Sequence, residues 1–457
     1  MISVQKIRLA ILGLVAMSSC GQQTGQIANR PPNVIVLLAD DMGYGDLSCY
    51  GHPTIRTPHL DRMADDGIRL TSFYMGAPIC TPARAALLTG RYPLRTGLPN
   101  VLLPESEHGL PAEEITFAEM LKETGYRTMY IGKWHLGDRA DYHPQRHGFD
   151  DYYGLLYSND MMPPWVDTQK PLTLFHGYEP IEYPVTQQTL TERYTTWGMD
   201  FIRQHKDKPF LLYLAYSMPH VPIFASEKFE GTSRGGTYGD VIETIDWSVG
   251  QLLAQLRELG IDEQTLVVFT SDNGPWQNMP DRMFSNDTIQ PWHCGSAGLL
   301  RGSKGDTYEG GSRVPALLRW PGTIPPGQVS ADLVTAMDLF PTFARAAGAR
   351  LPNDRELDGN DLLPFLRSET PSPTKAFLYY LRWDLQGVRV GNWKYRVAQS
   401  DGTQDHSVEE ELYDLEIDPS EKFNRIEALP EKARELKMFM TLQDEKIRKD
   451  KGYRAMY

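Results

Sequence analysis

The sequence contains little cysteine, with four residues of this type spread over 457 positions. Four cysteines cannot supply a dense disulfide framework, and no group of cysteine and histidine residues has the spacing of a zinc site. The apolar run near the start of the chain, Leu9 to Met17, is too short to span a bilayer. The sequence also has no internal repeat and no low-complexity array. These absences exclude disulfide scaffolds, zinc modules and repeat proteins.

Basic runs are missing as well, and the formal net charge is −13. This acidic balance argues against a nucleic acid as the partner. It does not exclude an anionic substrate, because the local field of a site can oppose the global charge. The length, with 41% hydrophobic residues, favours a globular enzyme with one large and one smaller domain, or two comparable domains.

The first twenty residues have the pattern of an export signal. Lys6 and Arg8 precede the apolar run, and Ser18-Ser19-Cys20 follows it. This ending resembles the lipoprotein box of bacteria, which predicts a signal peptide at residues 1–19 and a lipid on Cys20. Residues 20–31 then read as a polar tether. We expect export across the inner membrane and a periplasmic or outer-membrane lipoprotein; the alternative is plain signal cleavage without a lipid.

Four apolar runs predict strands that are buried on both faces of a parallel or mixed sheet. They cover residues 33–39, 127–131, 210–216 and 265–270, and the last of them is expected to be the last central strand. Helical spacing predicts helices at residues 57–66, 113–124, 190–205 and 239–259. Residues 161–184 have no clear period, and we expect irregular structure there, over the pocket.

The pattern changes after a Ser/Pro-rich linker at residues 369–374. Short strands are expected at 377–381, 387–390 and 394–397, followed by a helix at 430–449. These elements predict a small antiparallel subdomain of α+β character. The predicted domains are therefore a catalytic domain at 32–368 and a C-terminal subdomain at 375–457.

Polar residues follow the predicted strands. Asp40 and Asp41 come after the first strand, and Asp272 and Asn273 come after the last. Ligand sites in open α/β sheets lie beyond the carboxyl ends of such strands, and an all-oxygen ligand set suits Ca²⁺ better than zinc. Taken alone, either pair also fits a turn or a hairpin.

Cationic and imidazole side chains follow the other two strands. Lys133 and His135 come after residues 127–131, and alternate residues of extended chain face the same side. His220 follows residues 210–216, and Lys304 lies in a glycine-rich segment whose backbone can approach a small anion. Lys133 and His135 together suit an oxyanion with proton transfer nearby. The alternative is surface lysines and hydrogen-bonded histidines.

The segment Cys80-Thr81-Pro82-Ala83-Arg84 lies at a predicted junction of loop and helix. The positive end of a helix and an arginine one turn later both favour an anion beside the cysteine side chain. The alternative for Cys80 is a small buried thiol.

These segments resemble the signatures of the type I sulfatase family. Residues 80–90 match its Cys-x-Pro-x-Arg signature, and residues 132–137 match its Gly-Lys-Trp-His-Leu-Gly signature. Asp40-Asp41, the Tyr157-Ser158-Asn159-Asp160 loop and the segment of Lys304 match three more motifs. The resemblance covers nearly the whole chain and is to the branch of arylsulfatase A and N-acetylgalactosamine-6-sulfatase. It implies an alkaline-phosphatase-like α/β fold, with a central mixed, mostly parallel sheet flanked by helices.

The resemblance also implies the cofactors. Cys80 would be oxidised to formylglycine by a formylglycine-generating or sulfatase-maturing enzyme. The resemblance implies a Ca²⁺ ion bound by Asp40, Asp41, Asp272, Asn273 and the modified Cys80. The aldehyde hydrate then attacks sulfur, with Asp272 as base and Arg84 steadying the charge, which gives a covalent sulfo-enzyme.

The remaining roles complete the implied reaction. His220 or Lys304 protonates the leaving alcohol, and the sequence leaves open which of the two does so. His135 deprotonates the second hydroxyl of the hydrate, and sulfate is expelled. Lys133, Lys304 and Ser158 hold the sulfate oxygens.

Export and aromatic-rich loops favour a sulfated carbohydrate as substrate, such as a glycosaminoglycan or algal galactan fragment. One alternative is a phosphonate or phosphate monoester hydrolase of the same superfamily. Another is a non-catalytic lipoprotein that binds sulfated glycans. The remaining cysteines, Cys49 and Cys294, are expected to be two buried thiols rather than a disulfide.

Overall fold

The computed structural model describes residues 30–400 and 407–450. The predicted signal peptide, the lipid site at Cys20 and nearly all of the tether therefore lie outside the described residues. The same holds for the last seven residues of the predicted C-terminal subdomain.

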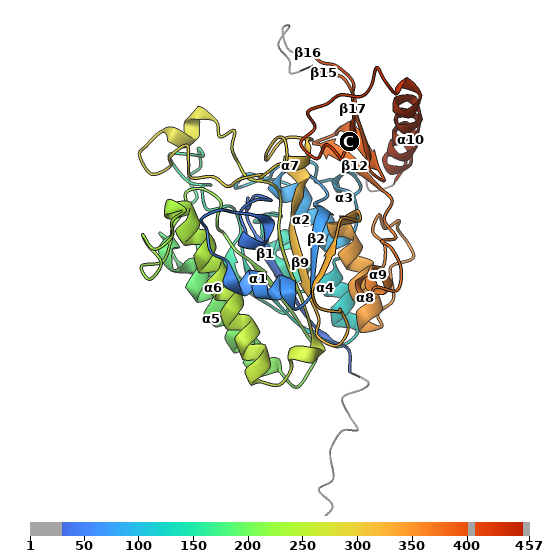
Figure 1. Cartoon of the computed structure of the whole chain (residues 1–457). Helices are drawn as coiled ribbons and strands as arrows, with labels where there is room; N and C mark the ends of the chain where they lie inside the picture. Colours follow the sequence, from blue (N-terminus) through green and yellow to red (C-terminus); the bar gives the residue numbers. More distant parts are fainter. Residues whose placement is uncertain (1–29, 401–406, 451–457) are drawn as a thin grey trace, which may run out of the picture. The chain divides into compact units, whose positions relative to one another are not determined.

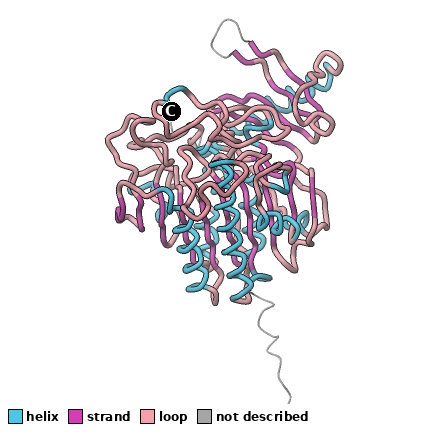
Figure 2. The backbone as a smooth tube through the Cα atoms, turned by 60° about the vertical axis from the view of Figure 1, so that its left-hand side comes forward, coloured by secondary structure: helices cyan, strands magenta, loops and turns pink. Residues whose placement is uncertain are grey.

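A large mixed sheet of eleven strands forms the centre of the fold (Figure 2). Its strands are β1 (Asn33–Ala39), β2 (Ile68–Tyr74), β3 (Arg127–Gly132), β4 (Asp151–Leu155), β5 (Leu174–His176), β6 (Glu179–Glu182), β7 (Phe210–Ala215), β8 (Thr265–Ser271), β9 (Arg313–Arg319), β10 (Gln328–Ser330) and β11 (Val334–Thr335). Their order is β10-β2-β9-β8-β1-β7-β3-β4-β5-β6, and β11 pairs with β2. The neighbours β8, β1, β7, β3 and β4 run parallel, so their carboxyl ends meet at one edge.

Strand β1 shows why the apolar runs form the middle of this sheet. All seven of its residues are buried, and alternate side chains point to opposite faces. Val34, Val36 and Leu38 join one hydrophobic core, whereas Ile35 and Leu37 join another. A strand that is covered on both faces needs an unbroken apolar run, and this is the pattern that the sequence has.

Helices cover both faces of the sheet (Figure 1). They are α1 (Pro58–Asp65), α2 (Cys80–Thr89), α3 (Pro93–Thr96), α4 (Phe117–Glu123), α5 (Leu190–His205), α6 (Gly236–Glu258), α7 (Glu309–Ser312), α8 (Leu339–Ala347), α9 (Leu363–Leu366) and α10 (Pro430–Arg448). Apolar residues of α1, α5 and α6 belong to one core, and those of α2, α4, α8 and α9 belong to the other. Within the described part of the chain, none of these helices has the length and apolar character needed to cross a membrane.

The C-terminal segment adds a small antiparallel sheet. It contains β12 (Ala376–Leu381), β13 (Asp384–Val390), β14 (Trp393–Arg396) and β17 (Glu411–Asp414), while β15 (Gln399–Ser400) pairs with β16 (Ser407–Val408). Helix α10 and this sheet share an apolar core with Tyr74, Tyr92 and Met337 from the larger part of the chain. The predicted fold class, an α/β sheet flanked by helices with a small antiparallel α+β part, is thus confirmed.

Three element predictions need correction. Strand β9 follows β8 and lies between β8 and β2, so the prediction that residues 265–270 form the last central strand is wrong. The arginines at both ends of β9 and Pro315 within it weaken the apolar pattern in the sequence. Residues 161–184, predicted to be irregular, include the β5–β6 hairpin at the edge of the sheet, where Pro180 is tolerated.

The third correction concerns α4, which begins four residues later than predicted, at Phe117. The side chain of Thr116 accepts a hydrogen bond from the Glu119 amide at 3.2 Å, and the Glu119 carboxylate accepts one from the Thr116 amide at 2.8 Å. This reciprocal capping box fixes the start of the helix.

Candidate functional site

The polar residues singled out in the sequence meet at the carboxyl edge of the sheet. Asp40 and Asp41 follow β1, and Asp272 and Asn273 follow β8, the parallel neighbour of β1. His220 follows β7, while Lys133 and His135 follow β3. Gly132 makes the turn before Lys133 possible, because its φ is +98° and a Cβ there would lie 1.7 Å from the Ala215 carbonyl oxygen.

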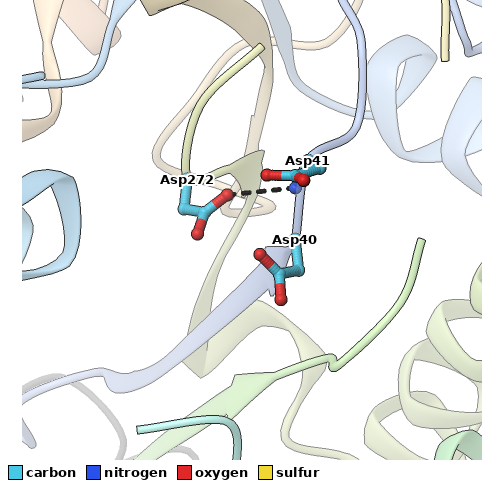
Figure 3. Close-up of side chains that lie close together, drawn as sticks. All are labelled: Asp40, Asp41 and Asp272. Atoms are coloured by element: carbon cyan, nitrogen blue, oxygen red, sulfur yellow. Dashed lines mark hydrogen bonds between the residues drawn. The ribbon is translucent and has the colours of Figure 1, made fainter. Parts of the chain in front are cut away.

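Three carboxylates form the centre of this site (Figure 3). Asp40, Asp41 and Asp272 are buried, and one ligand atom from each lies within 4.8 Å of the others. The Asp41 amide donates a hydrogen bond to Asp272 Oδ1 at 3.1 Å, and this contact joins the ends of β1 and β8. Asp41 has a φ of +65°, a conformation that aspartate tolerates better than most residues and that is common at functional sites.

The donor set of this cluster fits a hard cation. Among the described residues, the buried atoms Asp40 Oδ1 and Asn273 Oδ1 have no hydrogen-bond partner, although Arg84 Nη2 lies 3.4 Å from Asp40 Oδ1 as an ion pair. Buried polar atoms without a partner are costly, and a bound ion is one way to satisfy them. With Asp41 and Asp272, the available ligands are all oxygens, which is the set that Ca²⁺ prefers. Four of the five predicted metal ligands, all except Cys80, are therefore brought together at this cluster.

Three cationic side chains surround the carboxylates. Lys133 Nζ lies 2.6 Å from Asp40 Oδ2 and 3.1 Å from Ser158 Oγ. Lys304 Nζ lies 2.8 Å from Asp41 Oδ2. These ion pairs join residues that are far apart in the sequence and bring two ammonium groups to the same carboxylate cluster.

Arg84 is the third cation, and it contacts the carboxylates. Its Nη2 lies 2.8 Å from Asp272 Oδ2, and its Nη1 donates to the Lys133 carbonyl at 2.9 Å. Burial alone would raise the pKa of Asp40, but Lys133, His220 and Arg84 outweigh it and hold that pKa below its usual value. Burial would lower the pKa of Lys304, yet Asp41 overrides it and raises that pKa, so the lysine stays charged.

The two histidines make different contacts. His135 Nε2 donates to the Leu102 carbonyl at 3.0 Å, which leaves Nδ1 as the acceptor, and Nδ1 is a buried atom without a hydrogen-bond partner among the described residues. Burial and the nearby Lys133 hold the pKa of His135 well below its usual value, so the ring is neutral. His220 Nδ1 donates to the Val221 carbonyl at 2.6 Å, and its Nε2 lies 3.6 Å from Asp41 Oδ2.

Cys80 is the first residue of α2 and is buried. The sequence led us to expect an environment that favours an anion at this position. That expectation concerns an anion next to the side chain, not the thiol itself: burial raises the pKa of the Cys80 thiol, although Lys133 and Lys304 oppose the effect. The desolvation cost of a thiolate is larger than the combined attraction of the helix end and the cations. The unmodified thiol is therefore protonated at neutral pH.

Comparison with known proteins identifies the family of this fold and site. The sulfatase family model matches residues 32–349, and a model for the C-terminal part of N-sulphoglucosamine sulphohydrolase matches residues 303–450. The chain belongs to the sulfatase family. It is therefore a sulfuric ester hydrolase, as the signature motifs predicted.

Curated sulfatases resemble this one over most of its length. Human arylsulfatase A is 39% identical, with 92% of this chain and 89% of that protein covered. The N-acetylgalactosamine-6-sulfatase of Rattus norvegicus is 41% identical, with 86% of this chain and 75% of that protein covered. The crystal structure of Ps i-CgsB in complex with k-i-k-neocarrahexaose is 29% identical, with a TM-score of 0.79, and covers 92% of this chain and 94% of that chain. The predicted branch of the family is thus confirmed.

The structure of this sulfatase also contains contacts that the sequence did not single out. Asn159, which follows Ser158 in the loop, donates from Nδ2 to the Pro222 carbonyl at 2.8 Å and to Gln187 Oε1 at 3.0 Å. It thereby connects the loop of Ser158 to the loop of His220. Trp276 lies against both Lys304 and His220. The only feature of the sequence that could have pointed to Trp276 is its position directly after Asp-Asn-Gly-Pro.

The two remaining cysteines of this sulfatase are free and half-buried. Cys49 and Cys294 therefore form no disulfide, in agreement with the expected thiols, although both are more exposed than expected. The predicted lipid site at Cys20 lies outside the described residues.

Proposed function

We propose that this sulfatase hydrolyses a sulfate ester on a carbohydrate, with Cys80 as formylglycine and a Ca²⁺ ion at Asp40, Asp41, Asp272 and Asn273. One observation carries the proposal: at a single edge of the sheet, Cys80 lies near an all-oxygen cluster, two lysines and two histidines. Formylglycine would supply a hydrated aldehyde as the nucleophile toward sulfur, and Ca²⁺ held by these residues would supply Lewis-acid stabilisation of negative charge.

The chain's own residues bind and orient the sulfate in this proposal. Lys133 is held between Asp40 and Ser158, and Lys304 is held by Asp41, so both ammonium groups are fixed before a substrate arrives. Preorganised cations stabilise the charge of a sulfate in the transition state without a further cost of reorientation. Ser158 adds a hydroxyl beside Lys133.

The contacts of the titratable side chains support different roles in proton transfer. His135 is neutral with Nδ1 free to accept a proton, which fits the role of a base. His220 and Lys304 both remain candidates to protonate the leaving alcohol, because each contacts Asp41. Asp272 accepts hydrogen bonds from Arg84 on Oδ2 and from the Asp41 amide on Oδ1. Both oxygens thus already accept hydrogen bonds, which disfavours Asp272 as the base.

The carbohydrate substrate is supported by the similar proteins. One is named for a sulfate on N-acetylgalactosamine, and another was solved with neocarrahexaose bound. The substrate class that fits both is a sulfated sugar, such as a glycosaminoglycan or algal galactan fragment.

Mass spectrometry of the tryptic peptide 70–84 tests the nucleophile. In protein from its native host, conversion of Cys80 to the aldehyde lowers the peptide mass by about 18 Da. A peptide carrying only the unmodified thiol contradicts the proposed chemistry and favours a glycan-binding lipoprotein without catalysis.

The reaction is tested with a panel of substrates. We expect hydrolysis of 4-nitrophenyl sulfate, galactose 6-sulfate or N-acetylgalactosamine 6-sulfate, and little hydrolysis of 4-nitrophenyl phosphate. The reverse preference would favour a phosphonate or phosphate monoester hydrolase of the same superfamily.

We further propose that the protein is exported as a lipoprotein with residues 1–19 removed and a lipid on Cys20. A formylglycine-generating or sulfatase-maturing enzyme modifies Cys80. The boundary between the catalytic domain and the C-terminal subdomain lies between residues 368 and 375. Metabolic labelling with palmitate tests the anchor: label is expected on the wild type and absent from Cys20→Ala. A wild type that is exported without label supports plain signal cleavage instead.

A further inference from the structure

Trp276 lies against the two groups that could protonate the leaving alcohol. Lys304 Nζ is 4.5 Å from the centroid of the indole ring, within the range of a cation–π contact. The ring of His220 is 5.4 Å from the indole, tilted by 48°. The side chains of Lys304 and His220 are 9% and 3% exposed, whereas Trp276 is only half-buried. Part of the indole surface is therefore exposed, and the ring adjoins both groups.

The backbone holds Trp276 firmly in this place. The Gly274 amide donates to the Gly311 carbonyl at 2.9 Å, and the Lys304 amide donates to the Pro275 carbonyl at 2.9 Å. A Cβ at Gly274 would lie 1.8 Å from the Gly310 carbonyl oxygen, so the segment that precedes Trp276 packs backbone to backbone against α7. A narrow pocket beside them reaches Asp41 and is lined by Trp276 and His293.

Trp276 therefore differs from an ordinary surface tryptophan, because its ring contacts two groups of the proposed active site. A cation–π contact uses the face of the ring on the side of Lys304, where the sulfate is proposed to bind. The sugar that carries the sulfate must extend from this point toward solvent. An indole face attracts the weakly positive C–H groups on the apolar side of a pyranose ring, just as it attracts the positive edge of another aromatic ring.

We propose that Trp276 is a specificity-determining residue that stacks against the sugar ring of the substrate and directs its ester oxygen toward Lys304 and His220. This inference rests on the proposed function and narrows it, since it requires a leaving group with an apolar ring face. The sulfate group itself is bound by Lys133, Ser158 and Lys304, and the sugar ring is bound by the indole.

Two variants of Trp276 and one matched control test the stacking. Trp276→Ala removes the ring, and Trp276→Phe keeps a smaller aromatic face. Trp247→Ala is the control, because Trp247 is also half-buried and also lies under a lysine, with Lys228 Nζ 4.7 Å from its ring. It belongs to α6, and its ring packs against Phe229 rather than against Lys304 and His220. The probes are galactose 6-sulfate, N-acetylgalactosamine 6-sulfate and, as an inhibitor, inorganic sulfate.

We expect Trp276→Ala to raise KM for whichever sulfated sugar the wild type hydrolyses by about 3- to 10-fold, the value of one aromatic contact. Inhibition by inorganic sulfate should stay within about twofold of the wild type, because the sulfate contacts remain. Trp276→Phe should recover most of the loss, and Trp247→Ala should leave both constants unchanged.

Three results would overturn the inference. Equal weakening of sugar and inorganic sulfate by Trp276→Ala would show that the indole acts only through Lys304. An unchanged KM would show that the sugar does not contact the indole. If the wild type hydrolyses 4-nitrophenyl sulfate but neither sulfated sugar, a sugar ring is not the group that contacts the indole. Failure of the proposed function is distinct, since the wild type would then hydrolyse no sulfate ester at all.

Discussion

Lys394 is predicted to be essential for stability, because it neutralises two buried carboxylates. Its ammonium lies 3.0 Å from Glu309 Oε1 and 2.7 Å from Glu421 Oε1, and all three side chains are fully buried. Glu309 begins α7, just after the glycine-rich segment of Lys304, whereas Lys394 belongs to β14 of the C-terminal sheet. Lys394→Met keeps much of the volume and removes the charge. Removing one partner of a buried ion pair typically costs about 3–5 kcal/mol, so a loss of this size in the free energy of unfolding is expected.

The pH dependence gives this prediction a second readout. Burial raises the pKa of Glu421 to about 7, although Lys394 opposes the effect. The folded state therefore holds this proton more tightly than the unfolded chain, whose glutamate titrates near pH 4.3. The resulting stability is present at low pH and is lost as the pH rises through about 7. In Lys394→Met the carboxyl lacks its cation, so the deficit should be larger at pH 8 than at pH 5.

Urea unfolding at both pH values, followed by circular dichroism, measures these effects. Lys437→Met is the matched control, because Lys437 forms an exposed pair with Glu410 at 2.6 Å, and such pairs contribute at most about 1 kcal/mol. The double variant Lys394→Met/Glu421→Gln should be more stable than Lys394→Met at pH 8. A loss below about 1 kcal/mol in Lys394→Met, or an equal deficit at both pH values, would refute the reasoning.

Three further predictions concern other parts of the fold. Asp246 of α6 accepts hydrogen bonds from the amides of His59 and Leu60 at 3.0 and 2.8 Å, and burial raises its pKa to about 7. The wild type should therefore lose roughly 2 kcal/mol of unfolding free energy relative to Asp246→Asn between pH 5 and pH 8, because its aspartate gives up the proton over this range. Equal pH profiles of the two proteins in urea unfolding would contradict this. Adding Ca²⁺ at 100 times its dissociation constant to chelator-treated protein should stabilise it by about 2.7 kcal/mol in thermal unfolding, and an equal gain in Asp41→Asn would exclude the cluster as the site. Asn159→Ala should lower kcat for 4-nitrophenyl sulfate roughly tenfold through displacement of the His220 loop, with a smaller effect of Gln187→Ala; an unchanged kcat would assign Asn159 a purely structural role.

Much of the fold and of the candidate site could be predicted from the sequence because parallel strands impose a simple geometry. Unbroken apolar runs identified β1, β3, β7 and β8, and the residues after such strands must lie at one edge of the sheet. Asp41 and Asp272 could therefore be placed together although 231 positions separate them in the sequence. No knowledge of side-chain packing was needed for that step.

The contacts that depend on packing could not be predicted in the same way. The sequence does not show that Arg84 pairs with Asp272, or that burial keeps the Cys80 thiol protonated. The balance between desolvation and nearby charge depends on distances of a few ångströms, which no local pattern encodes. Strand β9 was missed for a related reason, since its terminal arginines are neutralised by Glu309 and Asp262 only in the folded chain.

The lysines and carboxylates of the site form one charge network rather than two neighbouring sites. Lys133 contacts Asp40 on one side and Ser158 on the other, and Lys304 contacts both Asp41 and Trp276. In the proposed function, a cation at the carboxylates and a sulfate at the lysines share these same contacts. A cation bound to the carboxylate oxygens competes with the lysines for those oxygens, so each ammonium group can interact more strongly with the sulfate. By linkage, the sulfate must then increase the affinity for the cation by the same factor.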